Sequence, residues 1–119
     1  MTGTITDGRP HVNLLIKGGG KQALAEFTVD TGYSGTLTLP LADCVALDLR
    51  ETGIRDSFLA DGSVIGLKMY ELTLVWDGKV CEFEILAIGA ERLLGAQVLK
   101  GYELCLNYDT NLLTIKKPS

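Results

Sequence analysis

The chain has 119 residues, a formal net charge of -4 and a hydrophobic content of 46%. This length predicts a single domain over residues 1–119 with a core of ordinary size. The negative charge argues against a nucleic-acid partner, because phosphate binding draws on clustered lysine and arginine. No apolar run is long enough to cross a bilayer, so a membrane partner is not expected either.

The number and spacing of cysteines and histidines indicate the cellular compartment and which metal sites are excluded. Cys44, Cys81 and Cys105 are too few and too dispersed for a disulfide framework, and their apolar neighbours predict buried thiols. A single histidine, His11, excludes a zinc site assembled from histidines. The stretch from Met1 to Asp7 lacks the basic and apolar regions of a signal peptide. We therefore expect a cytoplasmic protein with no cofactor and no metal.

The first half of the chain begins with a predicted hairpin. His11–Ile16 and Ala23–Val29 are predicted to be strands, and the glycines of residues 18–20 to form the turn between them. Pro40 can open a helix over Leu41–Leu49, since it lacks the donor that a first helical turn leaves unpaired. Its apolar face would be Leu41, Val45 and Leu49. The polar segment Arg50–Asp56, which contains Gly53, is predicted to be a surface connection.

In the second half the apolar period changes to two, which predicts antiparallel hairpins. The predicted strands are Ser57–Ala60, Ser63–Trp76, Lys79–Ile88, Tyr102–Tyr108 and Leu112–Lys116. Asp61-Gly62 and Asp77-Gly78 are the expected turns of the first two hairpins. A short helix is expected over Ala96–Lys100, ended by Gly101. Many short strands, two small helices and glycine turns favour a closed or nearly closed all-β fold.

The stretch from Phe27 to Gly35 is the candidate functional segment. An apolar, β-branched run ends in Asp30, Thr31 and Gly32, so the carboxylate sits where a strand stops. Gly32 supplies the backbone freedom of a sharp turn, and the hydroxyl of Thr31 can tie that turn to a neighbouring segment. Asp30 could also be a turn aspartate that satisfies nearby backbone donors.

Asp30-Thr31-Gly32, preceded by Phe27-Thr28-Val29, resembles the active-site loop of the retropepsin-like (clan AA) aspartic proteases of the prokaryotic, single-domain type. Glu91–Gly95, followed by Ala96–Lys100, is similar to the second signature of that family. Phe58–Ile65 falls where the family places its flap hairpin. The resemblance covers nearly the whole chain. It implies an all-β, retropepsin-like acid-protease barrel with one or two short helices.

The resemblance further implies an aspartic endopeptidase with Asp30 as its catalytic residue. Hydrolysis by this route needs two carboxylates that share one proton, and the chain has one Asp-Thr-Gly. The implied partners are therefore a second copy of the chain, in a twofold homodimer, and a peptide or protein substrate. The terminal strands Ile5–Arg9 and Leu112–Lys116 are the candidate interface.

The other site residues take their expected roles from the same resemblance. Thr31 would hydrogen-bond across the dimer, Gly32 would accept the substrate backbone, and Ser34 belongs to the same loop. The expected flap residues are Leu59, Ala60, Asp61, Gly62, Ser63 and Ile65. The structural signature that would pack beneath the loop is Leu93, Leu94 and Gly95. Tyr33, Leu59 and Ile65 would line side-chain pockets, which suggests small or apolar substrate residues next to the cut.

Tyr33 departs from the family pattern, which usually has alanine or serine after Asp-Thr-Gly. A side chain of this size beside the loop could occupy part of the cleft. The second hypothesis is therefore a catalytically inactive, dimeric β-barrel module of the same fold that binds a peptide or protein. A serine or cysteine hydrolase is disfavoured, because it would depend on His11 and nothing places Ser34 or Cys44 near that residue.

Overall fold

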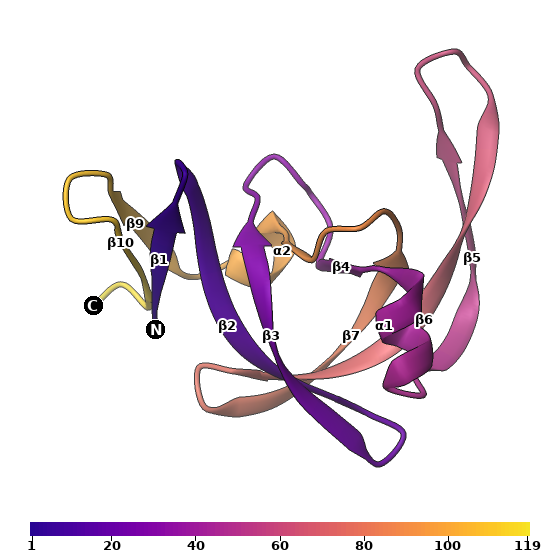
Figure 1. Ribbon diagram of the computed structural model, residues 1–119, viewed down its shortest axis with the longest axis horizontal. Helices are drawn as coiled ribbons and strands as arrows, with labels where there is room; N and C mark the ends of the chain where they lie inside the picture. Colours follow the sequence, from indigo (N-terminus) through magenta and orange to yellow (C-terminus); the bar gives the residue numbers. More distant parts are fainter.

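The computed structural model describes residues 1–119 as one ten-stranded sheet with two short helices (Figure 1). The strands are β1 (Thr2–Thr6), β2 (Arg9–Gly18), β3 (Lys21–Val29), β4 (Leu37–Leu39), β5 (Arg50–Phe58), β6 (Val64–Trp76), β7 (Lys79–Ala87), β8 (Leu93–Leu94), β9 (Glu103–Asn107) and β10 (Leu112–Lys116). The helices are α1 (Leu41–Ala46) and α2 (Ala96–Leu99). No helix combines the length and the apolar character that spanning a membrane would require.

The sheet closes on itself in its central part. Its strand order is β5-β6-β7-β4-β8-β3-β2-β1-β10-β9, and β2 also pairs with β6 through Ile16 opposite Leu74. This extra pairing makes a ring of β6, β7, β4, β8, β3 and β2, which confirms the all-β prediction. The outer end of the β5–β6 hairpin projects from one side of the ring, and β1, β10 and β9 extend from the other (Figure 1).

Alternating side chains of the ring strands fill its interior. Along β6, Tyr70, Leu72 and Leu74 are buried, as their shared strand face predicts. Val12, Leu14 and Ile16 do the same on β2. The remaining core is Ala25, Phe27, Val29, Leu37, Leu39, Cys44, Leu47, Leu49, Trp76, Ile85, Leu94, Val98, Leu113 and Ile115. This core lies directly beneath the end of β3, where the candidate site begins.

Asp-Gly turns decide where two of the hairpins fold. Asp77 and Gly78 both have positive φ, 51° and 75°, and join β6 to β7 in the predicted two-residue turn. Asp7 and Gly8, with φ of 53° and 75°, form the same turn between β1 and β2. The expected strand Ile5–Arg9 is therefore wrong, because the chain reverses at its centre.

Residues Arg50–Asp56 are the second departure from the sequence-based expectation. They belong to β5, an edge strand that pairs only with β6 and carries a β-bulge between Glu51 and Gly53. Most side chains of β5 are exposed. A strand without a buried face has no need of apolar alternation, so its polar sequence gave no strand signal.

Helix α1 is shorter than expected and buries a different face. It ends after Ala46, and Asp48 takes a left-handed conformation with φ of 53°. Leu41 and Val45, expected to face the core, are 48% and 69% exposed, whereas Cys44 is buried. Leu49 is buried but lies beyond the helix.

The three cysteines lie in different environments. Cys44 is buried, Cys81 is half-buried and Cys105, on β9, is exposed. Burial, assisted by the charge of Asp43, raises the pKa of the Cys44 thiol to about 11. The expectation of buried thiols is therefore wrong for Cys105, because that residue lies on the outward face of the strand at the edge of the sheet.

Candidate active site

Asp30 stands immediately after the last residue of β3 and is half-buried. Its N–H donates a hydrogen bond of 2.9 Å to the carbonyl of Leu94, which extends the parallel pairing of β3 with β8. Its Oδ1 accepts the N–H of Gly32 at 3.0 Å, whereas Oδ2 has no hydrogen-bond partner in the chain. One carboxylate oxygen thus fixes the turn, and the other is available to a ligand.

The loop after Asp30 is fastened to the start of α2. Three backbone N–H groups donate to loop carbonyls: Gly95 to Thr36 at 2.7 Å, Ala96 to Tyr33 at 2.8 Å and Gln97 to Gly35 at 3.1 Å. Leu94 is fully buried under the same loop and Leu93 is half-buried. The structure therefore brings the two sequence signatures, residues 30–34 and 93–95, into direct contact.

Tyr33 folds back over the loop rather than extending from it. A Cβ atom placed on Gly95 would lie 2.7 Å from Tyr33 Cδ2, and one on Gly35 would meet the hydroxyl end of the ring. The ring fits because both positions are glycine. Burial raises the pKa of the Tyr33 hydroxyl, and the charge of Arg55 on β5 opposes that shift. The ring therefore lies between the loop and the β5–β6 hairpin.

The remaining residues of the loop are open to solvent. Thr31, Gly32 and Ser34 are exposed, and the hydroxyl of Thr31 makes no hydrogen bond within the chain. The expected tie between Thr31 and a neighbouring segment is thus absent from the single chain. Its hydroxyl is free to bond to a partner.

The tip of the β5–β6 hairpin is organised by its own turn. The N–H of Leu59 donates to the carbonyl of Ser63 at 2.8 Å, and the Ser63 N–H donates to Asp61 Oδ1 at 2.9 Å. Hydrogen bonds from the Ser63 hydroxyl and N–H lower the pKa of Asp61. The expected flap residues Leu59, Ala60, Asp61, Gly62, Ser63 and Ile65 are all exposed. None of them lines the two cavities beside Tyr33. The hairpin residues that line these cavities are Arg55, Asp56, Ser57, Phe58, Leu67 and Met69.

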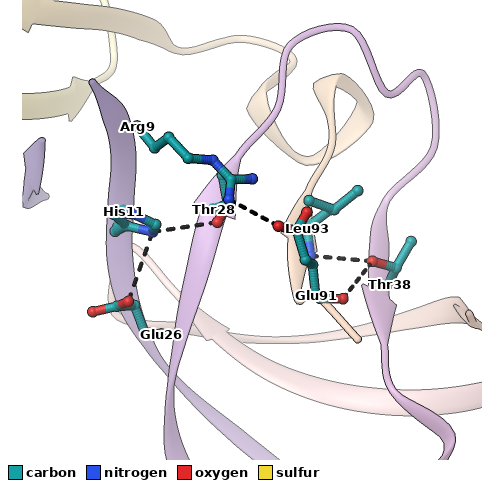
Figure 2. A network of polar contacts seen from close by, with 7 residues as sticks. All are labelled: Arg9, His11, Glu26, Thr28, Thr38, Glu91 and Leu93. Carbon is teal, nitrogen blue, oxygen red and sulfur yellow. Dashed lines mark hydrogen bonds and ion pairs between the residues drawn. The ribbon is translucent and has the colours of Figure 1, made fainter. Parts of the chain in front are cut away.

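A polar network runs across the strands next to the site (Figure 2). Arg9 Nη1 donates to Glu91 Oε1 at 2.8 Å, and this bond and its charge lower the pKa of Glu91. The same contact raises the pKa of Arg9, to which the charge of Asp30 also contributes. His11 Nδ1 lies 3.3 Å from Thr28 Oγ1 and 3.7 Å from Glu26 Oε1. The network thus links β2 to β3 and to the segment that precedes β8.

Thr38 connects β4 to β8 within this network (Figure 2). Its buried hydroxyl accepts the N–H of Leu93 at 3.1 Å and donates to the carbonyl of Glu91 at 3.3 Å. These bonds take the place of ladder bonds where β8 is only two residues long. They hold the Leu93–Leu94 segment in position under the Asp30 loop.

Arg9, Arg55 and Thr38 were not predicted from the sequence as site residues. Their partners lie far along the chain, so spacing gives no signal for them. No group of three His, Cys, Asp or Glu side chains is placed to hold a metal ion.

Comparison with known proteins supports the architecture. No protein-family model and no curated protein sequence matches the chain. Among solved structures, the chain is similar to EIAV protease complexed with the inhibitor HBY-793, with a TM-score of 0.60 and 19% identity over 79% of this chain and 88% of that chain. It is also similar to a retropepsin-like aspartic protease from Rickettsia conorii, with a TM-score of 0.65 and 16% identity over 100% of this chain and 90% of that chain. The protein therefore has the retropepsin-like fold of these aspartic proteases.

Proposed function

We propose that this protein is a homodimeric aspartic endopeptidase in which the Asp30 carboxylates of two copies activate one water molecule. The observation that carries the proposal is the state of Asp30: it is half-buried at the end of a core strand, with Oδ1 bonded to Gly32 and Oδ2 free. Its own N–H donates to the Leu94 carbonyl, and the N–H groups of residues 95–97 donate to carbonyls of its loop, which holds the loop in place. A turn aspartate without a further role would not need this support from a second segment.

The chemistry follows from bringing two such carboxylates together. Two carboxyl groups in close contact do not both ionise readily, because their negative charges repel each other. The pair therefore shares one proton and titrates as a unit. The ionised carboxylate takes a proton from the water while the protonated one donates to the scissile carbonyl. The resulting tetrahedral intermediate breaks its C–N bond when the amine nitrogen receives a proton. Each chain supplies one of the two carboxylates.

The free edge of the sheet supports a specific twofold contact. β10, a predicted interface strand, is already paired on both sides, with β1 and with β9. The open edge at that end is β9. An antiparallel pairing of β9 with its own copy uses all five residues only when it is centred on Cys105. It then places Leu104 opposite Leu106, and Glu103 opposite Asn107, so no like charges face each other.

The hairpin of β5 and β6 would act as the flap in this proposal. Its outer part carries exposed apolar side chains, including Phe58 at 78%, Val64 at 53% and Ile65 at 44%. Single chains rarely expose such a cluster unless it contacts something. An extended substrate would lie between this hairpin and the Asp30 loop, with main-chain hydrogen bonds to both. The free hydroxyl of Thr31 would bond to the partner's loop, and Gly32 would accept the substrate backbone.

The test is proteolysis of a denatured-protein or peptide mixture between about pH 3 and pH 7, the range in which a carboxylate pair titrates. Asp30→Asn keeps the shape of the side chain but cannot act as a base, so kcat/KM should fall by at least about 10²-fold. The control is Asp109→Asn, at an exposed turn whose carboxylate makes no hydrogen bond. Cleavage that survives Asp30→Asn would refute the proposal.

Tyr33 supports a second candidate, a dimeric peptide-binding module without catalysis. Its side chain lines both cavities beside the loop and so occupies space that a substrate side chain would otherwise fill. The same experiment separates the two functions. A dimer that binds peptides but cleaves none of them at any pH in this range would favour the binding module.

A further inference from the structure

Two cavities flank Tyr33, each with a volume of about 270 Å³. They share Tyr33, Gly35, Arg55 and Leu86 as walls. One continues to the acidic residues Glu82 and Glu84, whereas the other continues to Ser34 and Ser57, which carry hydroxyls, and to one acidic residue, Asp56. The two spaces on either side of one tyrosine therefore differ in the number of acidic residues and in hydrogen-bonding character.

Arg55 is the one arginine that forms no ion pair within the chain. Of the four arginines in the chain, the other three pair with carboxylates: Arg9 with Glu91 at 2.8 Å, Arg50 with Glu71 at 2.6 Å and Arg92 with Asp43 at 2.6 Å. No carboxylate lies within 4.0 Å of the Arg55 guanidinium. Arg55 is exposed and borders both cavities. A guanidinium with no internal partner at the border of a cavity is suited to a planar, bidentate anion.

The strand register directs Arg55 toward the loop. In β5, Arg55 lies opposite Leu67, and Ser57 lies opposite Ile65, so these four share one face of the hairpin. Asp56, which also borders the Ser57 cavity, belongs to the opposite face by strand alternation. The charge of Arg55 acts on the Tyr33 hydroxyl and opposes the rise in its pKa that burial causes. The guanidinium is therefore directed to the Tyr33 side of the hairpin.

We infer that the cavity between Ser34 and Ser57 binds a carboxylate of the peptide, held by Arg55 with the hydroxyls of Ser34, Ser57 and Tyr33 as further donors. We name this cavity the acid pocket; its lining residues are Tyr33, Ser34, Gly35, Arg55, Asp56, Ser57, Phe58, Leu67 and Leu86. The inference rests on the proposed function in one respect, namely that a peptide lies along the Asp30 loop. It replaces the expectation of small or apolar residues next to the cut with an acidic residue on one side.

The neighbouring cavity, on the other side of Tyr33, disfavours a carboxylate. Glu84 borders that cavity, and its Oε2 accepts a hydrogen bond from Thr52 at 2.9 Å. With Glu82 also at its border, a carboxylate placed there would meet like charge. An acidic residue is therefore accepted on one side of Tyr33 and rejected on the other. The carboxylate itself could be an Asp or Glu side chain or the free C-terminus of a peptide.

The test measures equilibrium binding and does not depend on cleavage. Fluorescent peptides are titrated against the full-length Asp30→Asn protein, in pairs that differ by Glu against Gln, and in pairs with a free or an amidated C-terminus. The Glu peptide should bind about 10-fold more tightly than the Gln peptide, as expected for a charge-assisted pair. Adding Arg55→Gln should bring the ratio of Glu-peptide to Gln-peptide affinity to about 1. With Arg55→Glu, a matching Lys peptide should bind more tightly than the Glu peptide.

Arg50→Gln is the matched control, because Arg50 lies on the same strand but borders neither cavity and already pairs with Glu71. It should leave the Glu-to-Gln ratio unchanged. An Arg55-dependent preference confined to the free C-terminus would assign the pocket to that carboxylate. Equal binding of acidic and neutral peptides, or a preference that survives Arg55→Gln, would overturn the inference. Failure of catalysis alone would leave the binding preference standing, so the two proposals fail separately.

Discussion

At the scale of single residues, two positions without side chains shape the candidate site. Tyr33 lies across Gly35 and Gly95, and the carbonyl of Gly35 comes into contact with the place where a Cβ of residue 95 would be. Neither glycine has a positive φ. They are required by close approach of the backbone and the ring, rather than by backbone conformation.

Gly95→Ala tests this directly. The added methyl group would overlap Gly35 and lie 2.7 Å from Tyr33 Cδ2, so the loop must move. We expect the free energy of unfolding to fall by about 1 to 3 kcal/mol, the usual cost of overpacking. Gly66→Ala is the control, because its Cβ would meet only the Cγ2 of exposed Ile54 at 3.0 Å, and it should change stability by less than about 0.5 kcal/mol. Urea denaturation monitored by the fluorescence of Trp76 measures both.

The residues of the site were predictable only where a local pattern carries them. Asp30 and Leu93–Gly95 stand at strand ends marked by apolar runs and glycine, and they lie in contact as the two signatures suggest. Arg9 and Arg55 carry no such mark. Their importance depends on Glu91 and Tyr33, which strand pairing brings near them from distant parts of the sequence.

At the scale of elements, the shortest strands depend on side chains for their pairing. β8 has two residues, and the hydroxyl of Thr38 on β4 accepts the N–H of Leu93 and donates to the carbonyl of Glu91, just before β8. The sequence predicted the long hairpins well, because buried faces impose alternation on them. It missed β5 because β5 buries no complete face, and it misjudged α1 because the helix ends after Ala46, before the third expected apolar residue, Leu49.

Thr38→Val tests the joint between β4 and β8. Valine has nearly the same shape but leaves the N–H of Leu93 and the carbonyl of Glu91 without this partner. We expect a loss of about 1 to 3 kcal/mol in the free energy of unfolding. Thr114→Val, on β10, removes a half-buried hydroxyl that makes no hydrogen bond, and should be close to neutral. Equal stability of the two variants would show that the Thr38 hydroxyl does not support β8.

At the scale of the whole molecule, the proposed dimer depends on the open edge of β9. The terminal strands were predicted as the interface, but β1 and β10 are used within the chain, and the next strand outward is free. The sequence could not distinguish these strands, because all are short and partly apolar. Only the order of the strands in the sheet shows which edge is uncovered.

Oxidative cross-linking tests this arrangement. Residues directly opposite in an antiparallel pair have Cβ atoms about 4.5 to 5.5 Å apart, near enough for a disulfide after a small adjustment. Mild oxidation should therefore link Cys105 to the partner's Cys105 and give a covalent dimer that retains activity. Cys105→Ser should prevent the link without preventing association. A solution dimer that never cross-links through Cys105 would place the twofold axis elsewhere.

The lone Asp-Thr-Gly of each chain has a further consequence for the proposed enzyme. If neither chain holds a complete set of reacting groups, hydrolysis follows the abundance of pairs, which below the dissociation constant rises with the square of the protein concentration. Newly synthesised chains would be inactive monomers while their concentration is low. Proteolysis would begin only when they accumulate, so the rate of synthesis would set its onset.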